Sequence, residues 1–228
     1  MLLQCRNLAK VYPKRGVEVR ALDGLDFELA AGEFVVVEGG SGCGKSTLLF
    51  SMGGMLRPSS GQVMAEERDL YEVGAAERER WRALKVGFVF QSFHLIPYWS
   101  VLENVLASGG GVDARGAGER RAEAESILGR LGLTPRLSHR PSELSAGEQQ
   151  RVAVARALHT RPSIILADEP TGNLDPESAA KVWEAMAAFH AGGGAVAAVT
   201  HGTEGRKFAT KLFRMERGRG GFCDLKKT

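Results

Sequence analysis

The fold of this chain is decided by one stretch, Glu38-Gly39-Gly40-Ser41-Gly42-Cys43-Gly44-Lys45-Ser46-Thr47. It follows the apolar run 34–37 and precedes Leu48-Leu49, a pattern that predicts a strand, a glycine-rich turn and a helix start. The spacing Gly39-x-x-x-x-Gly44-Lys45-Ser46 matches a phosphate-binding loop at every fixed position. Glycines let successive N–H groups point at phosphate oxygens, and the following helix adds the positive end of its dipole. We therefore expect nucleotide binding here, and not a glycine-rich turn without a ligand.

Two side chains of the loop have specific expected roles. Lys45 would reach the β- and γ-phosphates, and the Ser46 hydroxyl would complete the shell of a magnesium ion. The candidate nucleotide-binding residues of the loop are Gly39, Gly40, Ser41, Gly42, Cys43, Gly44, Lys45, Ser46 and Thr47.

Length and composition indicate an ordinary α/β domain. The chain has 228 residues, of which 43% are hydrophobic and 25% charged, and its net charge of +3 is spread along the sequence. Such a mild charge does not indicate nucleic-acid binding. Three cysteines without metal-ligand spacing favour a reducing compartment. No apolar run approaches the ~20 residues of a membrane span, and residues 1–6 are too short and polar for a signal peptide, so we expect a cytosolic chain.

The first part of the chain reads as strands, followed by the helix of the phosphate loop. Residues 2–29 predict an antiparallel sheet, in which Tyr12 could stack on a purine or simply pack at a strand end. Helices are predicted over 45–56 and 75–84, and a buried strand over 86–90 ends at Gln91. Gln91 would sit beside a metal or a water, or would only hydrogen-bond backbone.

The middle of the chain predicts helices. Residues 93–99 hold many large apolar groups, so they either pack under helices or present a partner surface, whereas the glycine-rich stretch 108–118 predicts a flexible loop. An amphipathic helix is predicted over 119–131. Ser145 and Glu148 have the spacing of a capping box that starts another helix. Gly147 is costly in that first turn, so a ligand that approaches closely would explain it.

Two further strands would bring acid, base and histidine to the loop. The apolar strand 163–167 ends at Asp168-Glu169, where ligands of open α/β sheets bind. Asp168 would hold magnesium, and Glu169 would accept a proton from the attacking water; acidic helix capping is the alternative. Asp175-Pro176 predicts a helix start. The buried strand 195–200 ends at His201, which would bind a γ-phosphate or be a structural histidine.

Together these residues resemble the nucleotide-binding domain of ABC transporters over nearly the whole chain. The motif Leu144-Ser145-Ala146-Gly147-Glu148-Gln149-Gln150-Arg151 resembles the family signature, although Ala146 and Glu148 replace a common glycine and glutamine. The resemblance implies a phosphate-loop α/β fold of the ABC ATPase type. This is a mainly parallel sheet with an N-terminal antiparallel β subdomain and an inserted helical subdomain at about 92–160, all within one domain of residues 1–228.

The resemblance also implies the site. It places Tyr12 on adenine, gives Glu169, His201, Lys45 and Gln91 catalytic roles, and assigns Mg²⁺ to Ser46, Gln91 and Asp168. ATP is the implied nucleotide. Ser145 and Gly147 would contact the ATP of a second copy in a head-to-tail dimer. His201 precedes Gly202-Thr203 instead of the acidic residue common at that position.

Within the family, residues 88–97, 102–105 and 169–175 look most similar to the lipoprotein-release and macrolide-efflux group. We therefore expect a partner permease in the membrane, which would hold the chain at the inner face of the cell membrane. The alternative is a regulatory or mechanotransmitting ATPase of the FtsE type that transports nothing. A nucleotide kinase is disfavoured by the signature helix.

Overall fold

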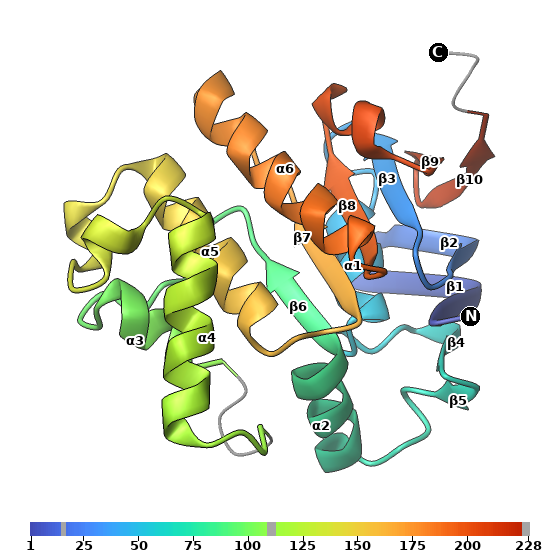
Figure 1. Ribbon diagram of the computed structural model, residues 1–228. Coiled ribbons are helices and arrows are strands. Elements are labelled where there is room, and N and C mark those ends of the chain that lie inside the picture. The colour runs from blue at the N-terminus through green and yellow to red at the C-terminus, as the bar shows by residue number, and fades with distance from the viewer. Residues whose placement is uncertain (15–16, 109–112, 225–228) are drawn as a thin grey trace.

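The computed structural model describes residues 1–14, 17–108 and 113–224 (Figure 1). The strands are β1 (Leu3–Lys14), β2 (Val17–Leu29), β3 (Phe34–Gly39), β4 (Ser60–Ala65), β5 (Arg68–Asp69), β6 (Val86–Val89), β7 (Ile164–Asp168), β8 (Ala195–Thr200), β9 (Lys211–Glu216) and β10 (Arg219–Cys223). The α-helices are α1 (Lys45–Met52), α2 (Ala75–Lys85), α3 (Val101–Leu106), α4 (Ala117–Arg130), α5 (Ala146–His159) and α6 (Pro176–Ala191). Short 3-10 turns lie at Thr134–Arg136, Pro141–Glu143 and Glu204–Phe208.

A six-stranded sheet forms the centre, in the order β10-β9-β3-β8-β7-β6. All its neighbours pair in parallel except β10, which is antiparallel to β9. Side chains of β3 alternate between two cores: Val35 packs with Leu48 of α1, and Phe34 packs with Trp183 of α6. Because both faces are covered, strands β3, β7 and β8 are apolar almost throughout, as buried parallel strands require.

The antiparallel sheet predicted at the N-terminus is present. Its strand order is β2-β1-β4-β5, with every pair antiparallel. Leu8 and Phe27 of this sheet belong to the same buried core as Leu48 of α1. The antiparallel sheet therefore covers α1 on the side of the helix that faces away from α6, and Figure 1 shows it at the right of the central sheet.

The helices α3, α4 and α5 form a separate group at the left of Figure 1. Their shared core includes Val105 of α3, Ile127 of α4 and Val152 of α5. Another face of α5 contributes Val154 and Ala157 to the core around Phe34 of the central sheet. Helix α5 thus joins the helical group to the sheet, and its N-terminus carries the signature motif.

The structure corrects several details of the sequence prediction. Helix α1 ends at Met52, not near residue 56, because Gly53 closes it and Gly54 has a φ of +70°. The C-terminal tail, which carried little signal, forms β9 and β10. Of the loop predicted over 108–118, residues 109–112 lie outside the described residues, and α4 already begins at Ala117. Across the described residues, no helix has the length and hydropathy needed to span a bilayer.

Candidate functional site

The phosphate loop joins β3 to α1, as predicted, and its glycines are required by close packing. Gly44 has a φ of +108°, and a side chain there would collide with the carbonyl oxygen of Ala21 on β2. A side chain on Gly39 would meet the carbonyl oxygen of Met215 on β9 and the Cys43 sulfur. The loop is therefore held between the two sheets with its backbone close to both.

Lys45 lies at the centre of the site and is almost completely buried. Its Nζ donates to the carbonyl oxygens of Gly39 at 2.9 Å and Gly40 at 3.1 Å. The same nitrogen lies 3.2 Å from His201 Nε2 and 3.9 Å from Glu169 Oε1. A buried ammonium needs such partners, and this arrangement holds a positive charge at the place where phosphate oxygens are expected.

Ser46 and Asp168 meet although they are far apart in the sequence. The Ser46 hydroxyl donates to Asp168 Oδ1 at 2.9 Å. Burial at the end of β7 raises the pKa of the Asp168 carboxyl above its usual value, and the hydrogen bond from Ser46 opposes that rise. Hydroxyl and carboxylate oxygens are the ligand types that Mg²⁺ prefers, so the donor set fits this ion.

Glu169 and His201 form the other pair of the site. Glu169 Oε1 lies 3.1 Å from His201 Nε2, and Oε2 accepts the backbone N–H of His201 at 3.2 Å. Glu169 has a φ of +45°, a conformation that is uncommon for a residue other than glycine. Backbone strain of this kind is frequent at functional sites. Here it accompanies a carboxylate that contacts both the lysine and the histidine.

Gln91, two residues after the end of β6, also lies near Glu169. A Cβ on Gly172 would lie 3.5 Å from Gln91 Nε2 and 3.7 Å from Glu169 Cβ, so both side chains border this glycine. The relation of Tyr12 to the phosphate loop is less direct. Its exposed ring lies on β1 opposite Val19 of β2, the strand whose Ala21 contacts the phosphate loop.

The signature residues occupy the N-terminus of α5. Ser145 caps the helix by accepting the Glu148 N–H at 3.2 Å, and Glu148 accepts the Ser145 N–H at 2.8 Å, as the capping box predicts. Glycine is needed at position 147 because a side chain there would collide with Ser178 at the start of α6. Close packing against α6 therefore requires glycine at this position, and the expected contact of Gly147 with a ligand stays a prediction.

One contact of the site was not predicted. Arg206, in the 3-10 turn after β8, binds Glu38 with two hydrogen bonds of 2.5 and 2.7 Å. Glu38 is the residue of β3 directly before the phosphate loop, and it is largely buried. The one available signal was a glutamate at the end of an otherwise apolar strand, which calls for a cationic partner.

These features define a class of protein: a phosphate-loop nucleotide hydrolase in which a second helix, α5, begins with the signature motif. The sequence model of the family "ABC transporter" matches residues 22–172. A lipoprotein-releasing system ATP-binding protein, LolD of Idiomarina loihiensis, is 44% identical, with 94% of this chain and 93% of the relative covered. An ABC transporter ATP-binding protein of Thermotoga maritima is 43% identical, with 96% and 93% covered.

The solved structures agree. A dimeric post-hydrolysis state of the ATP-binding cassette MJ0796, bound to ADP and Pi, has a TM-score of 0.92 and 33% identity, with 100% of both chains covered. This chain belongs to the ABC transporter family. The predicted fold, a phosphate-loop ABC ATPase with a mainly parallel sheet, an antiparallel β subdomain and inserted helices, is confirmed, and so is the ATPase class of the chain.

Proposed function

We propose that this chain is the ATP-binding and ATP-hydrolysing subunit of an ABC transporter of the export or lipoprotein-extrusion type. The observation that carries the proposal is the convergence of Lys45, Glu169 and His201 within hydrogen-bond or ion-pair distance of one another beside the phosphate loop. Nucleotide binding alone needs neither a strained glutamate nor a histidine beside it. A carboxylate of this kind can take a proton from a water that attacks the γ-phosphate.

The side chains divide the work by charge. The Lys45 ammonium, now held by loop carbonyls, would bind β- and γ-phosphate oxygens, and His201 would hydrogen-bond the γ-phosphate. Glu169 would orient the water and accept its proton. Ser46, Asp168 and Gln91 would hold Mg²⁺, which neutralises phosphate charge when it is bound. The exposed ring of Tyr12 would stack on adenine.

The site of one chain is incomplete without a second copy. Among the described residues, Ser145 hydrogen-bonds Glu148 and Gln149, and Gly147 packs against Ser178; none of these partners belongs to residues 39–47. We propose that these two residues contact the γ-phosphate of ATP bound to a partner copy, in a two-fold head-to-tail dimer. The dimeric state of the structural relative supports this proposal. We also propose that residues 1–228 form one domain with a helical insertion at about 92–160.

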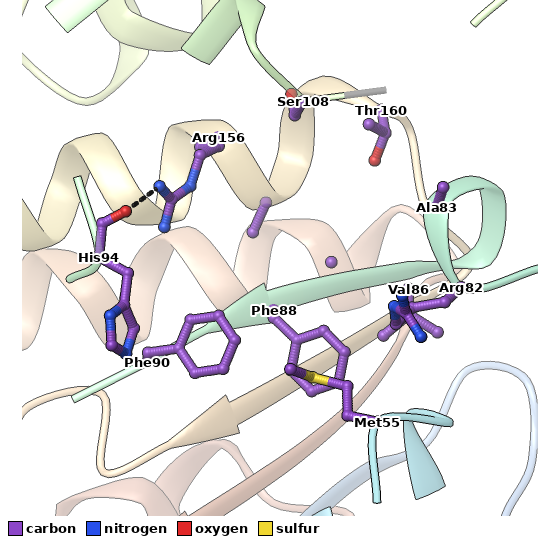
Figure 2. A pocket seen from close by; sticks show the side chains of 12 residues that line it. Met55, Arg82, Ala83, Val86, Phe88, Phe90, His94, Ser108, Arg156 and Thr160 are labelled. Atoms are coloured by element: carbon purple, nitrogen blue, oxygen red, sulfur yellow. Dashed lines mark hydrogen bonds between the residues drawn. The ribbon is translucent and has the colours of Figure 1, made fainter. Parts of the chain in front are cut away.

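A permease in the membrane would dock beside Gln91. A groove of about 370 Å³ lies between α5 and β6. Figure 2 shows the side chains that line it, among them Met55, Phe88, Phe90, His94 and Arg156. Arg156 donates to the carbonyl oxygen of His94 at 2.5 Å and to that of Phe93 at 2.7 Å, which fixes the loop at the groove. Nearby Tyr98 is 83% exposed. An apolar groove with exposed aromatic residues fits a helix of a partner subunit, and such docking would hold the chain at the inner face of the membrane.

The names of the relatives favour transport over the FtsE-like alternative, because the relative from Idiomarina loihiensis is named for a lipoprotein-releasing system. The hydrolytic function is tested by replacing Glu169 with Gln, which removes the base and keeps the size of the side chain. We expect ATP turnover to fall by at least about a thousandfold while ATP binding persists. A variant that hydrolyses ATP at the parent rate would show that Glu169 is not the base.

A further inference from the structure

A second cavity lies where α4, α5 and α6 meet, on another face of α5 from the groove beside Gln91. Its volume is about 640 Å³, within the usual range for sites that bind small organic molecules. None of the residues assigned to ATP, Mg²⁺ or the permease lines it. We call it the α4–α6 pocket.

The floor of the α4–α6 pocket is apolar. Helix α4 contributes Ile127, α5 contributes Leu158, and α6 contributes Ala185 and Phe189. Leu158, Ala185 and Phe189 are only partly buried and pack against the core around Phe34. Apolar surface that remains partly exposed at a concave site is covered favourably by an aliphatic or aromatic group, at about 25 cal/mol per Å².

The rim of the α4–α6 pocket carries an excess of positive charge. The lining holds four cations and only two carboxylates, Glu123 and Glu184. Arg161 pairs with Glu123 at 2.6 Å and with Glu119 at 3.9 Å, and Lys181 pairs with Glu177 at 2.6 Å; Glu119 and Glu177 lie outside the lining. Two more cations, Arg130 and Arg151, have no ion pair with a carboxylate of the described part of the chain. Glu184 likewise has no ion pair with a cation of the described part. The Nε of Arg151 is buried and lacks a hydrogen-bond partner among the described residues.

We infer that the α4–α6 pocket binds a small monoanionic amphiphile, a carboxylate headgroup on a single aliphatic chain. Four cations and two carboxylates line the pocket, so its lining attracts a carboxylate headgroup. Guanidinium groups bind a carboxylate through paired hydrogen bonds, and the exposed Arg130 has no ion-pair partner among the described residues. The aliphatic chain would cover the floor. A cationic amphiphile would meet repulsion at the rim, and a small polar anion would leave the floor uncovered.

Binding at this place would have a mechanical consequence, which rests on the proposed function. Helix α5 packs against both α4 and α6, and its N-terminus carries Ser145 and Gly147. A ligand that touches all three helices would hold the helical group against the central domain. We expect it to slow the approach of the signature helix to the ATP of a partner copy, and therefore to slow hydrolysis.

The test uses the full chain and laurate, below the concentration at which laurate forms micelles. Isothermal titration calorimetry without nucleotide measures binding to the pocket alone. Dodecyltrimethylammonium has the same chain with the opposite charge, and acetate has the headgroup without the chain. We expect laurate to bind at a single site and the other two to bind at least about tenfold more weakly.

Two pairs of variants locate the binding. Arg130→Glu reverses a rim charge, and its control Arg121→Glu reverses an exposed charge of α4 outside the pocket. Ala188→Trp narrows the mouth from α6, and its control Ala122→Trp places the same ring on the outer surface of α4. We expect the two pocket variants to weaken laurate binding by about tenfold or more and the controls to bind as the parent does.

A steady-state ATPase assay completes the test, because it separates the pocket from the proposed function. Hydrolysis without laurate depends on the nucleotide site and on the dimer, and not on occupancy of the pocket. Saturating laurate should lower kcat of the parent and leave kcat of Arg130→Glu unchanged. The inference is overturned if laurate does not bind, if the cationic amphiphile binds equally well, or if the pocket variants bind laurate as tightly as their controls. Bound laurate with an unchanged kcat would contradict the mechanical consequence.

Discussion

Glu38 and Arg206 connect the strand that enters the phosphate loop to the turn that follows His201. The guanidinium binds both carboxylate oxygens, at 2.5 and 2.7 Å, and the backbone of Glu38 pairs with Thr200 directly before the histidine. A bidentate pair of this geometry restricts both partners. We therefore expect the pair to influence hydrolysis through the position of His201 and not by contact with phosphate.

Arg206→Gln should lower kcat for ATP hydrolysis by about threefold to tenfold and leave KM for ATP nearly unchanged, because the histidine would be misplaced while the loop still binds phosphate. Glu38→Gln should have a similar effect. In the double variant the losses should not add, because both substitutions remove one interaction. Steady-state kinetics of the three variants provide the check. Losses that multiply, or a change confined to KM, would contradict a positioning role.

In the protein without nucleotide, the ionised Asp168 carboxylate should lower the stability of the folded state. The pKa of the Asp168 carboxyl is raised in the folded chain. The protonated carboxyl therefore adds stability below the unfolded pKa, and this stability is lost as the pH rises through the folded pKa. At pH 7 the carboxylate is therefore buried at a cost. Asp168→Asn should raise Tm by roughly 1–4 °C at pH 7 and abolish Mg²⁺-dependent hydrolysis.

Scanning calorimetry at several pH values provides the measurement for Asp168→Asn. The gain in Tm should shrink as the pH falls and the parent carboxyl becomes protonated. Ser46→Ala serves as a control, because it removes the hydrogen bond to Asp168 without removing the charge. A variant less stable than the parent at pH 7 would show that the Asp168 carboxylate stabilises the fold.

Cys43 offers a probe of the phosphate loop. It is 8% exposed, and its backbone N–H donates to the carbonyl oxygen of Gly40 within the loop. We expect bound ATP to slow its alkylation by N-ethylmaleimide by about tenfold or more, because phosphate would cover the thiol. Cys223 is exposed at the end of β10, outside the phosphate loop, so it provides an internal control whose labelling should not change. Equal labelling of Cys43 with and without ATP would place the nucleotide elsewhere.

The sequence predicts the parts of this site that depend on local spacing. The phosphate loop, the capping box of Ser145 and the acidic end of β7 each occupy a few consecutive residues, where geometry follows from local rules. Because parallel strands present their carboxyl ends at one edge, Asp168 and His201 could be placed beside the loop without a structure.

The remaining parts depend on contacts between distant segments. Glu38 and Arg206 are 168 positions apart, and no local pattern links them. The packing of Gly147 against Ser178 arises only when α5 packs on α6, so no local pattern predicts it. Residues 217–221 are basic and rich in glycine, which weakens strand propensity, and β10 forms there because it can pair with β9. Tertiary pairing outweighs local preference at these positions.

The central claim is that the ATP site of one chain is completed by the signature helix of another. The most direct measurement is the molar mass of Glu169→Gln by size-exclusion chromatography with light scattering, with ATP and with ADP. We predict a dimer with ATP and a monomer with ADP, because the γ-phosphate supplies the contact to Ser145 and Gly147. Adding Ser145→Arg should abolish the dimer while each chain still binds ATP. A Glu169→Gln protein that binds ATP and stays monomeric at every concentration tested would contradict the claim.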